Sequence, residues 1–146
     1  MKKILQLSCV PQSTDFGLLV LRLWLGLTLF FHHGLDKLIN HAHWSQVLPD
    51  PLHVGAHLNL ILIVLSEVVC SALVVLGIAT RLAALIIVIE LAVALFCVHH
   101  LALSGPFSGE LAFVNLAGFV TIVLAGGGRF VLCNKSNAVA AADPVV

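Results

Sequence analysis

Three ionisable residues, Arg22, Glu67 and Glu90, lie within long apolar stretches of the chain. If those stretches cross a membrane, a charge at the bilayer centre costs about 3 kcal/mol on insertion scales, so these side chains are expected to face the protein interior and to pair. At 1.5 Å per helical residue, they lie about 9, 16 and 12 Å, respectively, from the same membrane face. The guanidinium of Arg22 can bind one carboxylate through two hydrogen bonds and still offer donors to another. We therefore predict a buried ion pair with Arg22 at its centre.

Two glutamates that face one arginine leave one negative charge uncompensated, which is costly in a low-dielectric site. The simplest relief is that one carboxyl group holds a proton. Glu67 is the predicted holder, because it is the deeper of the two and the more distant from Arg22. The alternative is a polar clamp of Arg22, Glu67 and Glu90 that only fixes how the helices pair. Both interpretations stay open at this point.

Eight histidines gather toward the opposite ends of the same stretches. Imidazole is the commonest protein ligand for transition metals, and it titrates near neutral pH. A quinone head group needs donors such as histidine, and its tail needs an apolar groove; His33 and His100, with Glu110 nearby, are the first choice. His99 and His57 complete the candidate quinone or metal site. The cofactor is not identified: a quinone ranks first, and haem or a transition metal ranks second because no spacing matches a specific metal motif. The alternative is that the imidazoles simply lie at the level of the lipid head groups.

The elements that must position these residues follow from composition. Of 146 residues, 60% are apolar and 10% are charged, which is too little polar surface for a water-exposed globule. A helix of about 20 residues crosses the hydrocarbon core, and lipid cannot satisfy free backbone groups, so each long apolar stretch should be helical. We predict an all-α, four-transmembrane-helix bundle that forms a single membrane domain, with a disordered tail over about 134–146. The predicted helices span residues 16–33, 57–78, 82–101 and 110–126.

The distribution of basic residues predicts the orientation. With four spans, five lysines and arginines share one side and Lys37 lies alone on the other. Cytoplasmic loops carry the excess of basic residues, so both termini are expected in the cytoplasm. A net charge of zero, with basic residues scattered along the chain, also argues against nucleic acid as a partner. The five basic residues are Lys2, Lys3, Arg81, Arg129 and Lys135.

The order of these residues resembles that of the DoxX family. The first predicted helix and its end carry Arg22, Gly26, Phe30, His33, Gly34 and Lys37 at the spacing of the family's first-helix signature. Later landmarks are also similar: Glu67, the turn at residues 77–81, His99 or His100, and the segment at residues 126–130. The segment differs in detail, because residues 126–128 are Gly-Gly-Gly where the family has Gly-Pro-Gly.

The resemblance implies a four-helix protein of the bacterial inner membrane. The family was named for a subunit linked to a terminal quinol oxidase and to thiosulfate:quinone oxidoreduction, and other members are tied to membrane-associated redox complexes. The expected partners are therefore the lipid bilayer and other membrane subunits.

Three classes of function remain. The first is a membrane subunit associated with a quinone-linked respiratory or redox complex, with a buried Arg/Glu core and a histidine-rich outer face. The second is a purely structural or assembly subunit, and the third is a small proton-coupled or metal-handling transporter. The sequence contains no pairing of nucleophile and base, no phosphate loop and no dinucleotide fingerprint, so independent catalysis is not expected.

Overall fold

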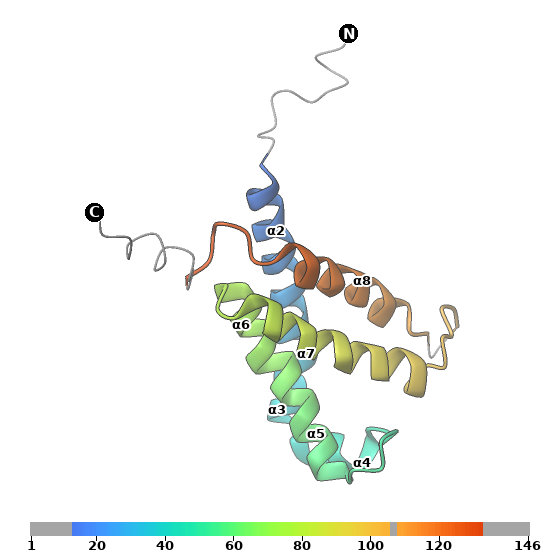
Figure 1. The fold of residues 1–146 in the computed structure, drawn as a ribbon. Helices are drawn as coiled ribbons and strands as arrows, with labels where there is room; N and C mark the ends of the chain where they lie inside the picture. Colours follow the sequence, from blue (N-terminus) through green and yellow to red (C-terminus); the bar gives the residue numbers. More distant parts are fainter. Residues whose placement is uncertain (1–12, 106–107, 133–146) are drawn as a thin grey trace, which may run out of the picture.

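The computed structural model describes residues 13–105 and 108–132, and every regular element in these ranges is helical (Figure 1). The first long helix runs without a break from Thr14 to Ile39. It begins where the Ser13 hydroxyl accepts a hydrogen bond from the backbone N–H of Phe16. Its end differs from the predicted range 16–33, because the helix continues for a further six residues, to Ile39. The helix consists of α2 (Thr14–Thr28), the π-helical turn η1 (Leu29–Gly34) and α3 (Leu35–Ile39).

The other predicted stretches are also helical. The second comprises α5 (Ala56–Val64), the π-helical turn η2 (Leu65–Cys70) and α6 (Ser71–Leu76); the third comprises α7 (Thr80–Val93) and the π-helical turn η3 (Ala94–Val98); the fourth is α8 (Glu110–Ala125). A short helix, α4 (His41–Val47), lies in the first connection. The second long helix ends at Gly77, whose φ of 76° suits a residue without a Cβ atom.

Three of these helices are long and apolar enough to cross a membrane: Thr14–Ile39, Ala56–Leu76 and Thr80–Val98. The chain is therefore an integral membrane protein whose outer side chains contact lipid. The 16 residues of α8 are equally apolar but span only about 24 Å. The predicted disordered tail at residues 134–146 lies outside the described residues, as do Lys2, Lys3 and Lys135 of the orientation argument.

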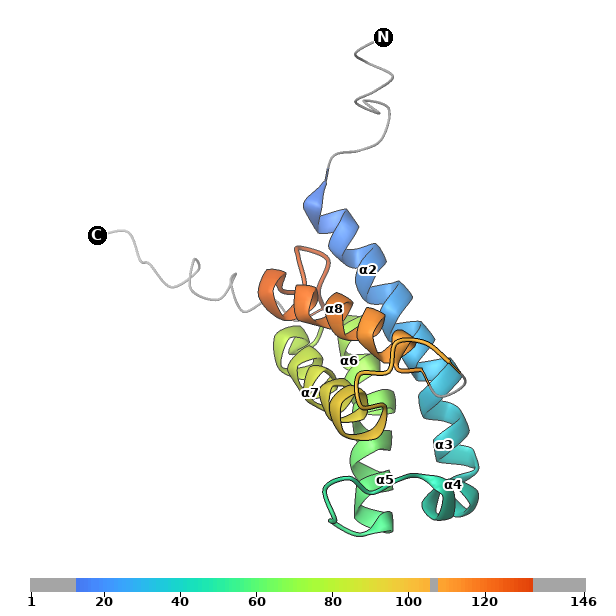
Figure 2. The same ribbon diagram turned by 90° about the vertical axis from the view of Figure 1, so that its right-hand side faces the viewer.

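The helices pack as two pairs. The α2–α3 helix lies beside α5–α6, and α7 lies beside α8 and runs across the first pair (Figures 1 and 2). The core forms where the pairs cross, between α2, α6, α7 and α8. Its buried apolar residues are Leu25, Leu29, Cys70, Val74, Ala83, Ala84, Ile87, Leu91, Phe119 and Ile122.

The first two long helices approach each other closely at Gly34. A Cβ atom added there would lie 2.9 Å from the carbonyl oxygen of Glu67 and 2.7 Å from a methyl group of Val68, so only glycine fits without a shift. Small residues allow membrane helices to approach in this way. The contact places the turn after Gly34, which carries Lys37, directly against η2.

Candidate functional site

Of the charged residues that the structure describes, Arg22 is the most deeply buried, with 1% of its surface exposed. Within the described ranges, its hydrogen bonds all go to backbone carbonyl oxygens. It donates to Val74 at 3.0 Å and Val75 at 3.2 Å, to Phe130 at 3.0 Å, and to Gly127. The first two acceptors belong to the last turn of α6, where carbonyl groups lack the usual helical partner; that of Val74 also accepts from the backbone N–H of Gly77 at 3.2 Å. Arg22 therefore joins α2 to the end of α6 and to the segment that follows α8.

The predicted pairing of Arg22 with Glu67 or Glu90 is wrong. The guanidinium makes four hydrogen bonds to carbonyl groups at one end of the helices, and the cation beside Glu67 is Lys37. The Lys37 Nζ atom lies 2.7 Å from both carboxylate oxygens of Glu67, and both side chains are buried. The negative charge of Glu67 thus has its own partner, and Glu90 becomes the surplus acidic group.

Lys37 was expected in an external connection, and its role was missed. The signal was nonetheless present, because Arg22, Gly26, His33 and Lys37 are separated by four, seven and four residues. This spacing repeats on one face of a helix, and it continues past the predicted end at residue 33. The face is also shielded: the Trp44 ring lies 5.8 Å from the Lys37 Nζ atom.

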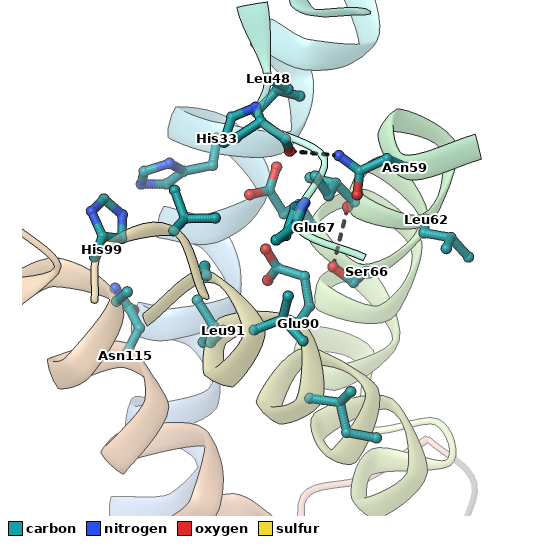
Figure 3. A pocket seen from close by; sticks show the side chains of 18 of the residues that line it. His33, Leu48, Asn59, Leu62, Ser66, Glu67, Glu90, Leu91, His99 and Asn115 are labelled. Carbon is teal, nitrogen blue, oxygen red and sulfur yellow. Dashed lines mark hydrogen bonds between the residues drawn. The ribbon is translucent and has the colours of Figure 1, made fainter. Parts of the chain in front are cut away.

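Glu90 extends from α7 toward the side on which Glu67 lies (Figure 3). Its Oε2 atom is buried and has no hydrogen-bond partner in the part of the chain that the structure describes. Its carboxyl group is within electrostatic range of Glu67 and Lys37. One ammonium group and two carboxyl groups therefore form an intramembrane cluster, which we call the acidic cluster. An intramembrane ionisable group that lacks a partner is a candidate functional group.

The acidic cluster borders a cavity of about 560 Å³ between the helices (Figure 3). Apolar side chains form most of its wall, and the connection after α4 contributes Leu48 and Pro49. Leu62 of α5 and Ile89 of α7 belong to the wall and are also exposed on the outer surface. Leu52 and Leu111 of the wall are exposed as well, so the cavity is partly open to the surface of the protein.

All three π-helical turns contribute to the cavity wall. These turns supply His33 from η1, Glu67 from η2 and Ala94 from η3. A π-helical turn adds a residue to the helical repeat and redirects the side chains that follow it, and such turns are frequent at functional sites. The helices are thus locally distorted where they surround the cavity.

The structure divides the predicted histidine site. His33 and His99 both line the cavity (Figure 3). His100, Glu110 and His57 are exposed and do not belong to the wall, so the structure does not bring His100 and Glu110 together with His33 around the cavity. In the described part of the chain, residues 13–105 and 108–132, no group of three or more His, Cys, Asp or Glu side chains could hold a metal ion. The described residues therefore do not fit the metal alternative.

A comparison with protein families confirms the resemblance to the DoxX family over the first three long helices. The family model of DoxX matches residues 17–100, which include Arg22, Lys37, Glu67 and Glu90. No curated protein matches the chain. No solved structure matches it either.

Proposed function

The chain belongs to the DoxX family, and we propose that it is a membrane subunit of a quinone-linked respiratory or redox complex whose internal cavity holds a quinone head group. The observation that carries this proposal is the cavity itself: about 560 Å³, mostly apolar, with the acidic cluster on its wall. Sites for small molecules and cofactors are typically about 300–1,000 Å³, apolar, and equipped with a few polar groups. A quinone has this character, because its ring is flat and apolar and its polar atoms are the two ring oxygens.

The surroundings of the cavity support the same ligand. A quinone dissolves in the bilayer, and the proposed opening to the lipid lies beside Leu62 and Ile89, two wall residues that are exposed on the outer surface. The polar groups at the inner wall, Lys37 and Glu90 together with His33, are placed to contact the ring oxygens. The tail of the quinone would then leave through the opening toward the lipid.

The proposed topology has four spans with both termini in the cytoplasm of a bacterium. α8 is as apolar as the longer helices and packs along α7, which supports its role as the fourth span. Arg81 in the first turn of α7 and Arg129 after α8 then lie on the cytoplasmic side. We propose further that the chain does not catalyse alone, and that partner subunits in the membrane exchange electrons with the bound quinone.

The acidic cluster favours one other function, that of a small proton-coupled transporter. A buried carboxyl group such as Glu90 that faces a cavity within the membrane is typical of proton relays. A purely structural subunit would need neither the cavity nor its unpartnered carboxyl group. The three functions are separated by whether the purified protein carries quinone, moves a solute, or does neither while retaining its partner chains.

Filling the cavity should abolish quinone binding. We expect the protein purified from its membrane to retain quinone, and Ala94→Trp to retain at least tenfold less, because the indole would occupy the space of the ring. The measurement is chromatography of the organic extract, with quinone counted per protein chain. Ala117→Trp is the matched control, because Ala117 is exposed on α8 and outside the cavity wall. If wild-type protein carries no quinone, or if the two variants carry equal amounts, the proposal is wrong.

A further inference from the structure

A second depression, of about 400 Å³, lies where α6 ends and α7 begins. The helices on either side of this turn, Ala56–Leu76 and Thr80–Val98, are long and apolar enough to span the membrane, so the turn lies at the level of the lipid head groups. The wall consists of the turn, the start of α7, the glycine segment at residues 126–128 and Val131. We call this depression the basic hollow, because Arg81 lines it and no described carboxylate does.

The start of α7 brings hydrogen-bond donors to the basic hollow. The helix begins at Thr80 without a side-chain cap, so the N–H groups of its first turn have no acceptor within the helix. Arg81 in the same turn donates one hydrogen bond, to the carbonyl oxygen of Leu124 at 3.2 Å, and a guanidinium has five N–H groups. Backbone N–H groups and the helix dipole together favour an anion at such a position.

The hydroxyl group of Thr80 indicates that a ligand belongs in the basic hollow. Thr80 lines the hollow and is 7% exposed, yet its hydroxyl group has no hydrogen-bond partner among the described residues. A Cβ atom added at Gly127 would lie 2.9 Å from the Thr80 Oγ1 atom, and one at Gly126 would lie 3.1 Å from the Arg81 Nε atom. The glycines therefore keep the space beside both donors open. Because buried hydroxyl groups are nearly always hydrogen-bonded, we expect a ligand to supply the acceptor.

The buried guanidinium of Arg22 lies directly behind the wall. Its Nη2 atom would lie 3.0 Å from a Cβ atom added at Gly77, and its Nη1 atom 3.3 Å from one added at Gly127. Its hydrogen bonds in the described ranges go to carbonyl groups, so no described carboxylate balances its charge directly. Asp15 lies near the segment, but its carboxylate accepts the backbone N–H of Arg129 at 3.0 Å and does not line the hollow. An anion in the hollow would supply the missing balance.

An apolar surface leads away from the basic hollow along α7. Leu82 lines the hollow and is exposed, and the exposed side chains of Leu85, Ile86 and Ile89 follow it. Residues at this spacing lie on one face of a helix. The acyl chains of a lipid whose phosphate group occupies the hollow would lie along this face, whereas a free phosphate ion would use the donors alone.

We propose that the basic hollow binds the phosphate group of an anionic phospholipid. The phosphate oxygens accept hydrogen bonds from the Thr80 hydroxyl group, from the first N–H groups of α7 and from the Arg81 guanidinium, and charge-assisted hydrogen bonds of this kind are among the strong ones. Basic pockets between membrane-spanning helices bind phosphorylated head groups in this way. The bound lipid would join the turn between α6 and α7 to the glycine segment after α8.

The test counts lipids on the full-length protein. The protein in detergent is titrated with dioleoyl phosphatidylglycerol or with dioleoyl phosphatidylcholine, and native mass spectrometry reports the lipids bound per chain. We expect the first phosphatidylglycerol to bind about tenfold more tightly than phosphatidylcholine, whose choline group adds a positive charge beside Arg81. Thr80→Val and Arg81→Gln should each weaken the binding of phosphatidylglycerol by about tenfold, because each removes a donor to a charged group.

Two controls separate binding from folding. Thr121→Val and Arg129→Gln make the same chemical changes at exposed positions that do not line the basic hollow, and they should bind phosphatidylglycerol as wild type does. Thr80→Val removes a hydroxyl group that has no partner among the described residues, so without added lipid it should melt as wild type does.

Three results would overturn the proposal. The first is equal affinity of the wild-type protein for the two lipids, a comparison that needs no substitution. The second is binding of phosphatidylglycerol by Thr80→Val and Arg81→Gln that matches the two controls. The third is displacement of the lipid by millimolar inorganic phosphate, which would make a free anion the occupant of the hollow. None of these results bears on the quinone cavity, which lies elsewhere in the fold.

Discussion

Lys37→Met is expected to lower the melting temperature of the protein in detergent by roughly 10 °C. The substitution leaves the Glu67 carboxylate buried without its cation, and breaking a buried pair in this way costs about 3–5 kcal/mol. For a chain of this size, each kcal/mol corresponds to about 2–4 °C. The melting temperature can be measured as the temperature at which half of the protein ceases to elute as a single species in size-exclusion chromatography.

The double variant gives the control for this prediction. Glu67→Met in the Lys37→Met background removes the unpaired charge, and replacing a buried ion pair by apolar residues is often neutral or stabilising. We expect the double variant to recover most of the lost stability. Arg129→Met, which changes an exposed basic residue, should have little effect. If Lys37→Met melts like wild type, or if the effects of the two substitutions simply add, the pair does not stabilise the fold.

Arg22→Leu is expected to release the segment that follows α8. Two of the carbonyl groups bound by Arg22 belong to Gly127 and Phe130, which flank a trypsin site at Arg129. Loss of the guanidinium leaves these groups and that of Val75 without this donor, at about 1–3 kcal/mol for each group that stays buried and unpaired. Trypsin should therefore cleave after Arg129 at least tenfold faster, and the melting temperature should fall by roughly 10 °C.

Two further substitutions serve as controls for Arg22→Leu. Arg22→Lys keeps the charge but cannot reach carbonyl groups on two separate segments at once, so it should be intermediate. Arg81→Leu loses a single exposed hydrogen bond, to the carbonyl oxygen of Leu124, and should leave cleavage after Arg129 nearly unchanged. Cleavage rates that do not differ between Arg22→Leu and wild type would contradict the role that we assign to Arg22.

The helices could be predicted from the sequence because each depends on many apolar residues together and not on any single one. A long run of apolar side chains forces a helix in lipid whatever the individual residues are, so the four helical stretches were found. The first boundary was wrong because the span was predicted to end at residue 33, where the run of apolar residues stops. In the structure, Lys37 is buried by pairing with Glu67, and a paired charge no longer has to lie outside the membrane.

The partner of Arg22 could not be predicted by counting charges. Its acceptors are backbone carbonyl groups, which every residue possesses and which become available only where a helix ends. The sequence shows that a buried guanidinium needs acceptors, and it contains two glutamates that could serve. Only the packing reveals that Gly127 and Phe130 lie within reach and that Glu67 is occupied by Lys37.

The candidate site was predicted in part. Glu67, Glu90, His33 and His99 were all identified from their residue types, and the structure places them around one cavity. Whether His99 or His100 faces the cavity depends on the π-helical turn η3, which changes the direction of the side chains that follow it. The periodicity of the sequence does not predict such a turn. The cavity itself arises between helices, so no single segment encodes it.

The account is tested most directly by locating a bound quinone on the chain. An azido derivative of decylubiquinone, bound to the full-length protein and then illuminated, should attach covalently to cavity residues such as Leu62, Ala94 and Asn115, which mass spectrometry of the fragments can identify. An excess of decylubiquinol should suppress this labelling. The account would be contradicted by labelling confined to lipid-facing residues such as Trp24 and Leu124, or by cavity labelling that excess quinol leaves unchanged.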